Sequence, residues 1–319
     1  MRRGLAGRLI LIAAAAVIVA VLPFVLSDYH QGLGADVAVY VMAILGLNIL
    51  TGYTGQISIG HGAFMAIGGY TTAILSHDHH VDLVATLPVS FALTFACGVL
   101  VGLPALRLSG VYLALVTFAL AVSVPQFPLE FSKFTGGSNG IATSQSVSQT
   151  WLYGAAWTTA ALLYAVAWLV LRGRTGRAFR AIRDSEVAAT SSGVALPIYK
   201  TLAFGISAAF AGVAGSFFVL ATNGFAQPNE FTLFLSLELL IGAAVAGLGS
   251  LWGVPIGAMF IALLPTLSAS TPVIGSAHGQ DLVFGLAVIL VILLLPTGVA
   301  GLAGANFKFT PTTWIRNKS

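Results

Sequence analysis

The sequence predicts an all-α, polytopic membrane protein. Of its 319 residues, 57% are hydrophobic and only 8% are charged, whereas a soluble globular chain carries roughly 25% charged residues. The mean hydropathy is +0.95. The apolar residues also form long continuous segments that are separated by short polar turns. This composition cannot cover the surface of a water-soluble domain, and a disordered chain would carry far more charge.

The hydrophobic segments define the expected topology. Arg2, Arg3 and Arg8 precede the first segment, which is longer than the core of a signal peptide and is therefore expected to be a span. At roughly 20 residues per spanning helix, the chain has room for about ten segments that cross or enter the membrane. These segments are residues 9–26, 36–50, 61–76, 83–106, 111–127, 151–171, 199–221, 237–248, 252–270 and 281–299.

The basic residues orient these segments. The formal charge of +4 comes largely from Arg and Lys residues at the N-terminus, in residues 172–197 and in the C-terminal tail. Because cytoplasmic loops carry an excess of these residues, both termini are expected to be cytoplasmic and the number of crossings even. We expect one transmembrane domain, residues 1–319, with a cytoplasmic loop at 172–197 and a cytoplasmic tail at 300–319.

Two pairs of segments predict helical hairpins, or broken helices, that are interrupted by glycine. Residues 36–50 and 61–76 are short for spans, and residues 237–248 and 252–270 form the second pair. Such interrupted segments point to a transport pathway, because irregular backbone at membrane depth must be covered by protein or by a water-filled cavity. The alternative is that the glycines only allow close helix packing. The connections contain Gly52, Gly55 and Gly60 in the first pair and Gly247, Gly249 and Gly253 in the second.

Polar side chains gather around the first connection. Polar groups in hydrocarbon need partners, so these side chains are expected to face the bundle interior or a cavity. Backbone groups freed at a glycine break can also bind a solute. The alternative is that the side chains bond one another and only hold the fold together. They are Asn48, Thr51, Gln56, Ser58 and His61.

The basic segment 172–197 predicts a short amphipathic helix on the cytoplasmic face. Phe179 and Ile182 lie on one side of it, and Arg177 and Arg180 lie on a neighbouring stripe. Gly193 is expected to end it. Such a helix can dock into a groove of a partner or lie on anionic lipid headgroups, and the sequence favours docking only modestly.

The sequence lacks the motifs of the common catalytic and metal-dependent classes. It has no phosphate-binding loop of the form G-x-x-x-x-G-K-[ST], no H-E-x-x-H and no clustered Cys and His ligands. We therefore expect neither an enzyme nor a metal site. A proton- or sodium-coupled carrier would need a carboxylate deep in an apolar segment, and Glu238 only begins one. A secondary carrier is kept as the alternative from a different class.

Three stretches carry a family resemblance. They are Leu47–Leu75 (LNILTGYTGQISIGHGAFMAIGGYTTAIL), Gly176–Phe217 and Glu238–Phe260. In order and content they resemble the LivM-type permease of branched-chain amino acid ABC importers, over about residues 36 to 300. Within the second stretch, Glu186-Val-Ala-Ala-x3-Gly193 is similar to the EAA-type loop by which import permeases engage their ATPases. Val187 stands where a strict triplet has alanine.

The resemblance implies a machine of five parts in the bacterial cytoplasmic (inner) membrane. This chain and a LivH-like second permease would form the pathway, two ABC ATPase subunits would power it, and an extracytoplasmic solute-binding protein would deliver the solute. ATP and Mg would bind in the ATPases, so no cofactor is expected in this chain. The implied solutes are leucine, isoleucine and valine. Urea, short amides or other amino acids are the alternative.

The resemblance also assigns roles to residues. For coupling to the ATPases it implies Arg177, Arg180, Arg183, Glu186 and Gly193. As candidates that line the pathway or hinge it, it implies Asn48, Thr51, Gly55, Gln56, Ser58, Gly60, His61, Gly247, Gly249 and Gly253.

Overall fold

The structure is a computed structural model that describes residues 27–106, 108, 110–269, 285–290, 293–295 and 298–303. Most of these residues are helical, because the chain is rich in Ala, Leu and Val and satisfies its backbone within each segment, as a membrane requires. The longer helices are α2 (Asp28–Leu47), α3 (His61–His79), α4 (Leu83–Ala105), α5 (Val111–Ser123), α8 (Gln149–Arg172), α9 (Arg174–Asp184), α11 (Leu196–Ala221), α12 (Leu233–Ala246) and α13 (Val254–Ala269).

Shorter elements connect them. A π-helix, η2 (Asn48–Tyr53), continues α2, and the short strands β1 (Ile141–Ala142) and β2 (Phe225–Ala226) pair antiparallel. The remaining elements are η3 (Val124–Gln126), α6 (Phe127–Glu130), α7 (Ser132–Thr135), η4 (Gly137–Asn139), α10 (Glu186–Ser191), η5 (Pro228–Glu230) and α15 (Val299–Ala303).

Six helical stretches of the described part are long and apolar enough to cross a membrane. They are Asp28–Tyr53, Leu83–Pro104, Val111–Glu130, Gln149–Arg172, Leu196–Ala221 and Pro228–Ala246. The chain is therefore a multi-pass, all-α membrane protein, as the sequence predicts. The total of about ten segments and the side of the termini stay predictions. Segment 9–26, part of 281–299 and both termini lie outside the described residues.

The expectation that residues 36–50 form a short segment is wrong. The helix begins at Asp28 and runs without interruption through η2 to Tyr53, which makes 26 residues. Its polar first turns, which hide it from a hydropathy reading, are satisfied by α8: Thr150 Oγ1 donates to Gln31 Oε1 at 2.8 Å, and Trp157 Nε1 donates to the Gly34 carbonyl at 3.0 Å. Nor do α2 and α3 form a self-packed hairpin, since each packs mainly against α11.

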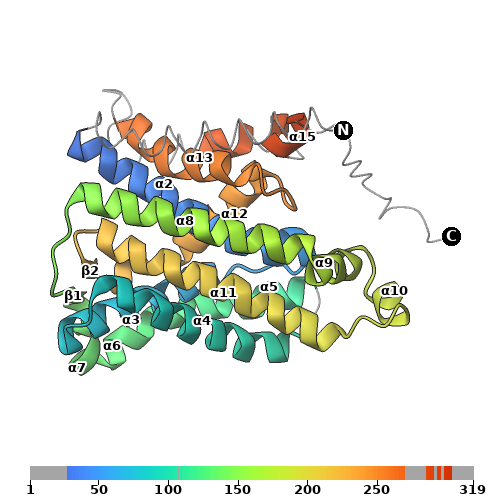
Figure 1. The fold of residues 1–319 in the computed structure, drawn as a ribbon, viewed down its shortest axis with the longest axis horizontal. Helices are drawn as coiled ribbons and strands as arrows, with labels where there is room; N and C mark the ends of the chain where they lie inside the picture. Colours follow the sequence, from blue (N-terminus) through green and yellow to red (C-terminus); the bar gives the residue numbers. More distant parts are fainter. Residues whose placement is uncertain are drawn as a thin grey trace.

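Helices α2 and α11 form the centre of the bundle. In their most apolar windows, 78% of α2 with η2 and 83% of α11 are buried, against 22% of α4 and 28% of α8. α2 and α11 pack against each other, and Figure 1 shows α8 and α11 running along the long axis of the molecule. Helices α9 and α10 lie at one end of the bundle, and β1, β2, α6 and α7 lie at the other (Figure 1). The outward apolar faces of α4 and α8 suit contact with lipid.

Glycines bring α3 and α11 into backbone contact. A Cβ at Gly68 would lie 2.0 Å from the Gly212 carbonyl oxygen, and one at Gly215 would lie 1.9 Å from the Met65 carbonyl oxygen. The close-packing role that the sequence left open for its glycines therefore operates between these two helices.

We expect Gly215→Ala to destabilise the chain, because its methyl group would force α3 away from α11. Such overpacking lowers the free energy of unfolding by about 1–3 kcal/mol. This corresponds to a fall of ~3 °C or more in the thermal unfolding midpoint. The measurement is thermal unfolding of the purified chain in detergent. Gly154→Ala in α8 is the matched control, since a Cβ there meets nothing within 4 Å. Equal midpoints for the two variants would refute the packing role.

Candidate functional site

The first break is a π-helix followed by a short irregular segment. Helix α2 widens into η2 at Asn48–Tyr53, and the chain leaves helical geometry until His61. π-helical turns are rare and are frequent at functional sites. Gly55 has φ +73°, a conformation that glycine adopts without strain. The sequence places a break here correctly, but the π-helix itself has no signal in the sequence.

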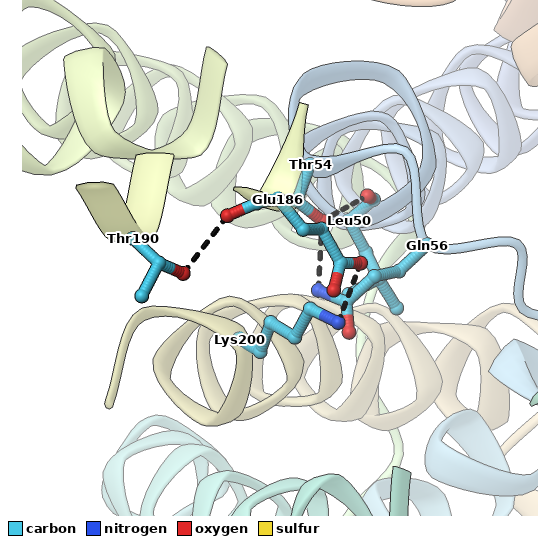
Figure 2. A network of polar contacts seen from close by, with 6 residues as sticks. All are labelled: Leu50, Thr54, Gln56, Glu186, Thr190 and Lys200. Carbon is cyan, nitrogen blue, oxygen red and sulfur yellow. Dashed lines mark hydrogen bonds and ion pairs between the residues drawn. The ribbon is translucent and has the colours of Figure 1, made fainter. Parts of the chain in front are cut away.

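Side chains of the break satisfy its freed backbone groups. Thr54 Oγ1 donates to the Leu50 carbonyl at 2.6 Å, and Thr51 Oγ1 donates to the Gln56 carbonyl at 3.1 Å. Gln56 Nε2 donates to Thr54 Oγ1 at 2.9 Å (Figure 2). Gln56 is 6% exposed, and its Oε1 has no hydrogen-bond partner among the described residues. This oxygen is therefore the acceptor in the break that is free for another group.

The second break separates α12 from α13. Gly247 and Gly249 have φ values of +93° and +84°. A Cβ at Gly253 would lie 1.8 Å from the Ala246 carbonyl oxygen. Backbone conformation and space thus both require glycine here.

The two breaks contact each other through Asn48. Its Nδ2 donates to the Ser250 carbonyl at 2.7 Å, and the Gly249 amide donates to its Oδ1 at 2.7 Å. Asn48 is completely buried. Gly52 completes the contact, since a Cβ there would lie 2.3 Å from the Gly249 nitrogen. Segments about 200 residues apart in the chain therefore meet at one part-buried junction, which the sequence did not indicate. We call Asn48, Gly52, Gly249 and Ser250 the break junction.

His61 anchors the start of α3 to α11. Its Nε2 lies 2.6 Å from Ser207 Oγ, and Ser207 Oγ donates to the Gly46 carbonyl at 2.6 Å. Because the Ser207 hydroxyl gives its only hydrogen to Gly46, the Nε2–H donates to Ser207. Nδ1 is then left to accept from Ser58 Oγ, 3.3 Å away. Both ring nitrogens are engaged within the fold, which supports the alternative in which His61 holds the bundle together.

The rest of the first break is bonded to α5 and α12. The Ile59 amide donates to Thr117 Oγ1 at 3.0 Å, and the Gly62 amide donates to Ser236 Oγ at 2.9 Å. A Cβ at Gly60 would lie 2.8 Å from the Thr117 carbonyl oxygen. The sequence did not predict roles for Thr117, Ser207, Ser236 and Ser250. Their one signal was a hydroxyl within or beside an apolar segment.

Segment 172–197, which the sequence predicts to be cytoplasmic, forms two helices where one was expected. α9 ends at Asp184, and α10 begins after Ser185, whose Oγ accepts from the Ala188 amide at 3.3 Å as an N-cap. Phe179 and Ile182 are buried against the bundle itself, and the Phe179 ring packs edge-on against Tyr199 at 6.4 Å. The apolar side that the sequence offered to a partner or to lipid is therefore already covered.

Three charged residues of this segment contact other parts of the protein. Arg180 Nη1 donates to the Leu171 carbonyl at 3.2 Å, and Arg183 Nη1 donates to the Gly52 carbonyl. The Glu186 carboxylate pairs with the buried Lys200 ammonium at 2.6 Å (Figure 2). By contrast, Arg177 and Gly193 are exposed.

Apolar side chains are exposed at the same end of the bundle. Val187 in α10 is 79% exposed and Ile198 at the start of α11 is 66% exposed, and Ala188 and Pro197 beside them are exposed too. We call these four residues the end patch. The sequence singled out the charged residues around this patch rather than the patch itself.

No group of three or more His, Cys, Asp or Glu residues that could hold a metal ion occurs in the described part of the chain. The expectation that the sequence lacks every common catalytic motif, G-x-S-x-G included, is wrong on one point, since residues Gly136–Gly140 have that spacing. They form a turn between α7 and β1, not the strand-to-helix turn that a nucleophilic serine needs.

Comparisons with known proteins place the chain among transport permeases. A family model described as branched-chain amino acid transport system, permease component, matches residues 32–295. The high-affinity branched-chain amino acid permease protein LivM of Escherichia coli K12 is 33% identical over 273 residues, which cover 75% of this chain and 63% of LivM. The corresponding LivH protein is 26% identical over 286 residues, which cover 82% of this chain and 91% of LivH.

A further relative has another named solute. The autoinducer 2 import permease LsrC of Klebsiella pneumoniae is 31% identical over 144 residues, 43% of this chain and 41% of LsrC. The matched region of this chain corresponds to 63% of the length of LivM, which is somewhat less than two thirds. No solved structure matches it.

We expect Asn48→Leu to destabilise the chain, because the Gly249 amide and the Ser250 carbonyl would both lose their buried partner. Each unsatisfied group costs about 1–3 kcal/mol. Thermal unfolding of the purified chain measures the effect, and Asn229→Leu at an exposed position is the control. An unfolding midpoint equal to that of the control would show that the Asn48 hydrogen bonds do not contribute to stability.

Proposed function

Because the chain belongs to the branched-chain amino acid transport permease family, we propose that it is a LivM-type transmembrane subunit of an ABC importer. It carries leucine, isoleucine and valine inward and is powered by separate ATPase subunits. The observation that supports this most is the extent of the family match, because residues 32–295 include both glycine breaks and the whole cytoplasmic segment.

The solute assignment rests on relatives and on the chemistry of the breaks. The LivM and LivH relatives are named for branched-chain amino acids. The buried polar side chains of the first break are uncharged hydroxyl and amide groups and an imidazole, which suits a small neutral or zwitterionic solute. Because the LsrC relative is named for autoinducer 2, family membership alone does not select the solute, and urea or a short amide is the second candidate.

The two breaks are the proposed pathway lining or hinge. Gln56 is the candidate for direct contact with the solute, since its Oε1 has no partner among the described residues. Asn48, Thr51, Ser58 and His61 are hydrogen-bonded within the fold, which suits hinge or scaffold roles. The glycines of the two breaks, Gly55, Gly60, Gly247, Gly249 and Gly253, supply the irregular backbone.

The proposed partners follow from the same assignment. They are a LivH-like second permease, two ABC ATPase subunits that bind ATP and Mg, and an extracytoplasmic solute-binding protein, all at the bacterial inner membrane. The cytoplasmic segment is the proposed ATPase dock. The end patch gives it an uncovered apolar surface, whereas a secondary carrier has no need of a dock.

Transport by the reconstituted complex tests the proposal. The chain, its second permease, the ATPases and the binding protein are placed in sealed liposomes, and uptake of labelled leucine is compared with uptake of labelled urea. We expect saturable leucine uptake that requires ATP and is inhibited by isoleucine and valine but not by urea. Preference for urea would select the second candidate. Concentration of solute by the chain alone, without ATPases, would establish a secondary carrier.

We expect Val187→Asp to lower solute-stimulated ATP hydrolysis by about tenfold, because a charge in the centre of an apolar contact removes a docking anchor. ATP hydrolysis is measured in the reconstituted complex, and solute binding to the binding protein should be unchanged. The control Ser146→Asp adds the same charge at an exposed position between β1 and α8, outside the end patch. Normal stimulation in the Val187 variant would exclude the end patch as the dock.

A further inference from the structure

The position of Arg183 assigns it a role that the sequence did not indicate. Arg183 belongs to α9, in the cytoplasmic segment, yet its guanidinium Nη1 donates to the carbonyl of Gly52 in the first break. A Cβ at Gly249, in the second break, would lie 2.5 Å from the same Nη1. The guanidinium therefore reaches the break junction and lies against both breaks.

The fit around this side chain depends on glycine. A Cβ at Gly55 would lie 3.5 Å from Arg183 Cγ, so the aliphatic stem of the arginine runs past the first break before its head reaches the second. The Gly52 carbonyl belongs to the last turn of the helix formed by α2 and η2. The C-terminal end of a helix carries partial negative charge and unsatisfied carbonyls, so a cation is favourable there.

We propose that Arg183 is a positioning residue that transmits motion of the cytoplasmic segment to the two glycine breaks. This inference rests on the proposed function, since it assumes that an ATPase moves α10. Only Ser185 separates α9 from α10. A displacement of α10, which carries Val187 and Ala188 of the end patch, therefore also displaces Arg183. Withdrawal of Arg183 frees Gly52 and Gly249 together and loosens both breaks at once.

Two other roles for Arg183 make different predictions. If Arg183 bound the ATPase directly, its loss would abolish assembly of the complex or its ATPase stimulation. If it only stabilised the fold, its loss would lower thermal stability, uptake and ATP hydrolysis together. A transmitting residue should instead separate ATP hydrolysis from uptake.

The first experiment uses the full-length chain alone in lipid nanodiscs. Ile57 and Leu248 are each 42% exposed and lie one in each break, so spin labels on I57C and L248C report the separation of the breaks. The single native cysteine is removed as C97S. We expect Arg183→Gln to broaden and lengthen the distance distribution, whereas the exposed control Arg174→Gln on the same helix leaves it unchanged. Identical distributions for the two variants would overturn the proposal.

The second experiment uses the same labels in the complete complex, with and without ATP. The native complex should change the distance between the breaks when ATP is added, and Arg183→Gln should abolish this change. Uptake per ATP hydrolysed should fall by about tenfold, while ATP hydrolysis stays near that of Arg174→Gln. A normal ATP-dependent distance change in Arg183→Gln would overturn the inference. Failure of the chain to form any complex with ATPases would refute the proposed function, and the first experiment would still test the contact.

A second variant tests the same contact from the second break. Gly249→Ala adds a Cβ 2.5 Å from Arg183 Nη1 at a residue with φ +84° and should uncouple uptake in the same way. If both substitutions act through one contact, the double variant should be no worse than the more severe single variant. Additive losses would show that the two residues act independently and would contradict the proposal.

Discussion

The constraint on which this structure depends is that a broken helix inside an apolar bundle must find partners for the backbone groups that it frees. Water does not solvate such groups in hydrocarbon, and each one left unsatisfied costs several kcal/mol. Here side chains supply the partners. Asn48 uses both ends of its amide on the second break, Thr54 and Thr51 bond carbonyls of the first, and Arg183 bonds Gly52 from outside the bundle.

This constraint also separates scaffold from pathway. A polar group already engaged with the protein must exchange that partner before it can bind a solute, and the exchange has a free-energy cost. His61 and Asn48 are engaged at both of their polar atoms, so they define the shape of the break region. Gln56 retains an acceptor without a partner among the described residues. The polar residues of one motif thus divide into those bonded within the fold and one, Gln56, that keeps an acceptor for another group. Their positions in the sequence do not distinguish the two kinds.

Much of this could be predicted from the sequence, because it depends on composition and local chemistry. The all-α membrane class follows from hydropathy, the family resemblance is confirmed by the match over residues 32–295, and the glycine breaks lie where expected. What failed depends on contacts between distant segments. The start of α2 at Asp28 is concealed by polar residues that α8 satisfies, and the single expected cytoplasmic helix is divided by the N-cap at Ser185. The junction of the breaks is a tertiary contact with no local signature.

Segment 172–197 shows why a charged residue in the sequence does not by itself mark an outer contact. An arginine at the end of a helix has carbonyls of its own protein within reach, and Arg180 and Arg183 both use them. Glu186 is likewise held by the buried Lys200. Arg174, Arg177 and Asp184 stay exposed, so charged and apolar side chains both face outward at this end of the bundle. The apolar ones form the end patch, Val187 and Ile198 above all. The charges of segment 172–197 therefore divide into a set that bonds the protein itself and a set that faces outward, and sequence position alone does not separate the two sets.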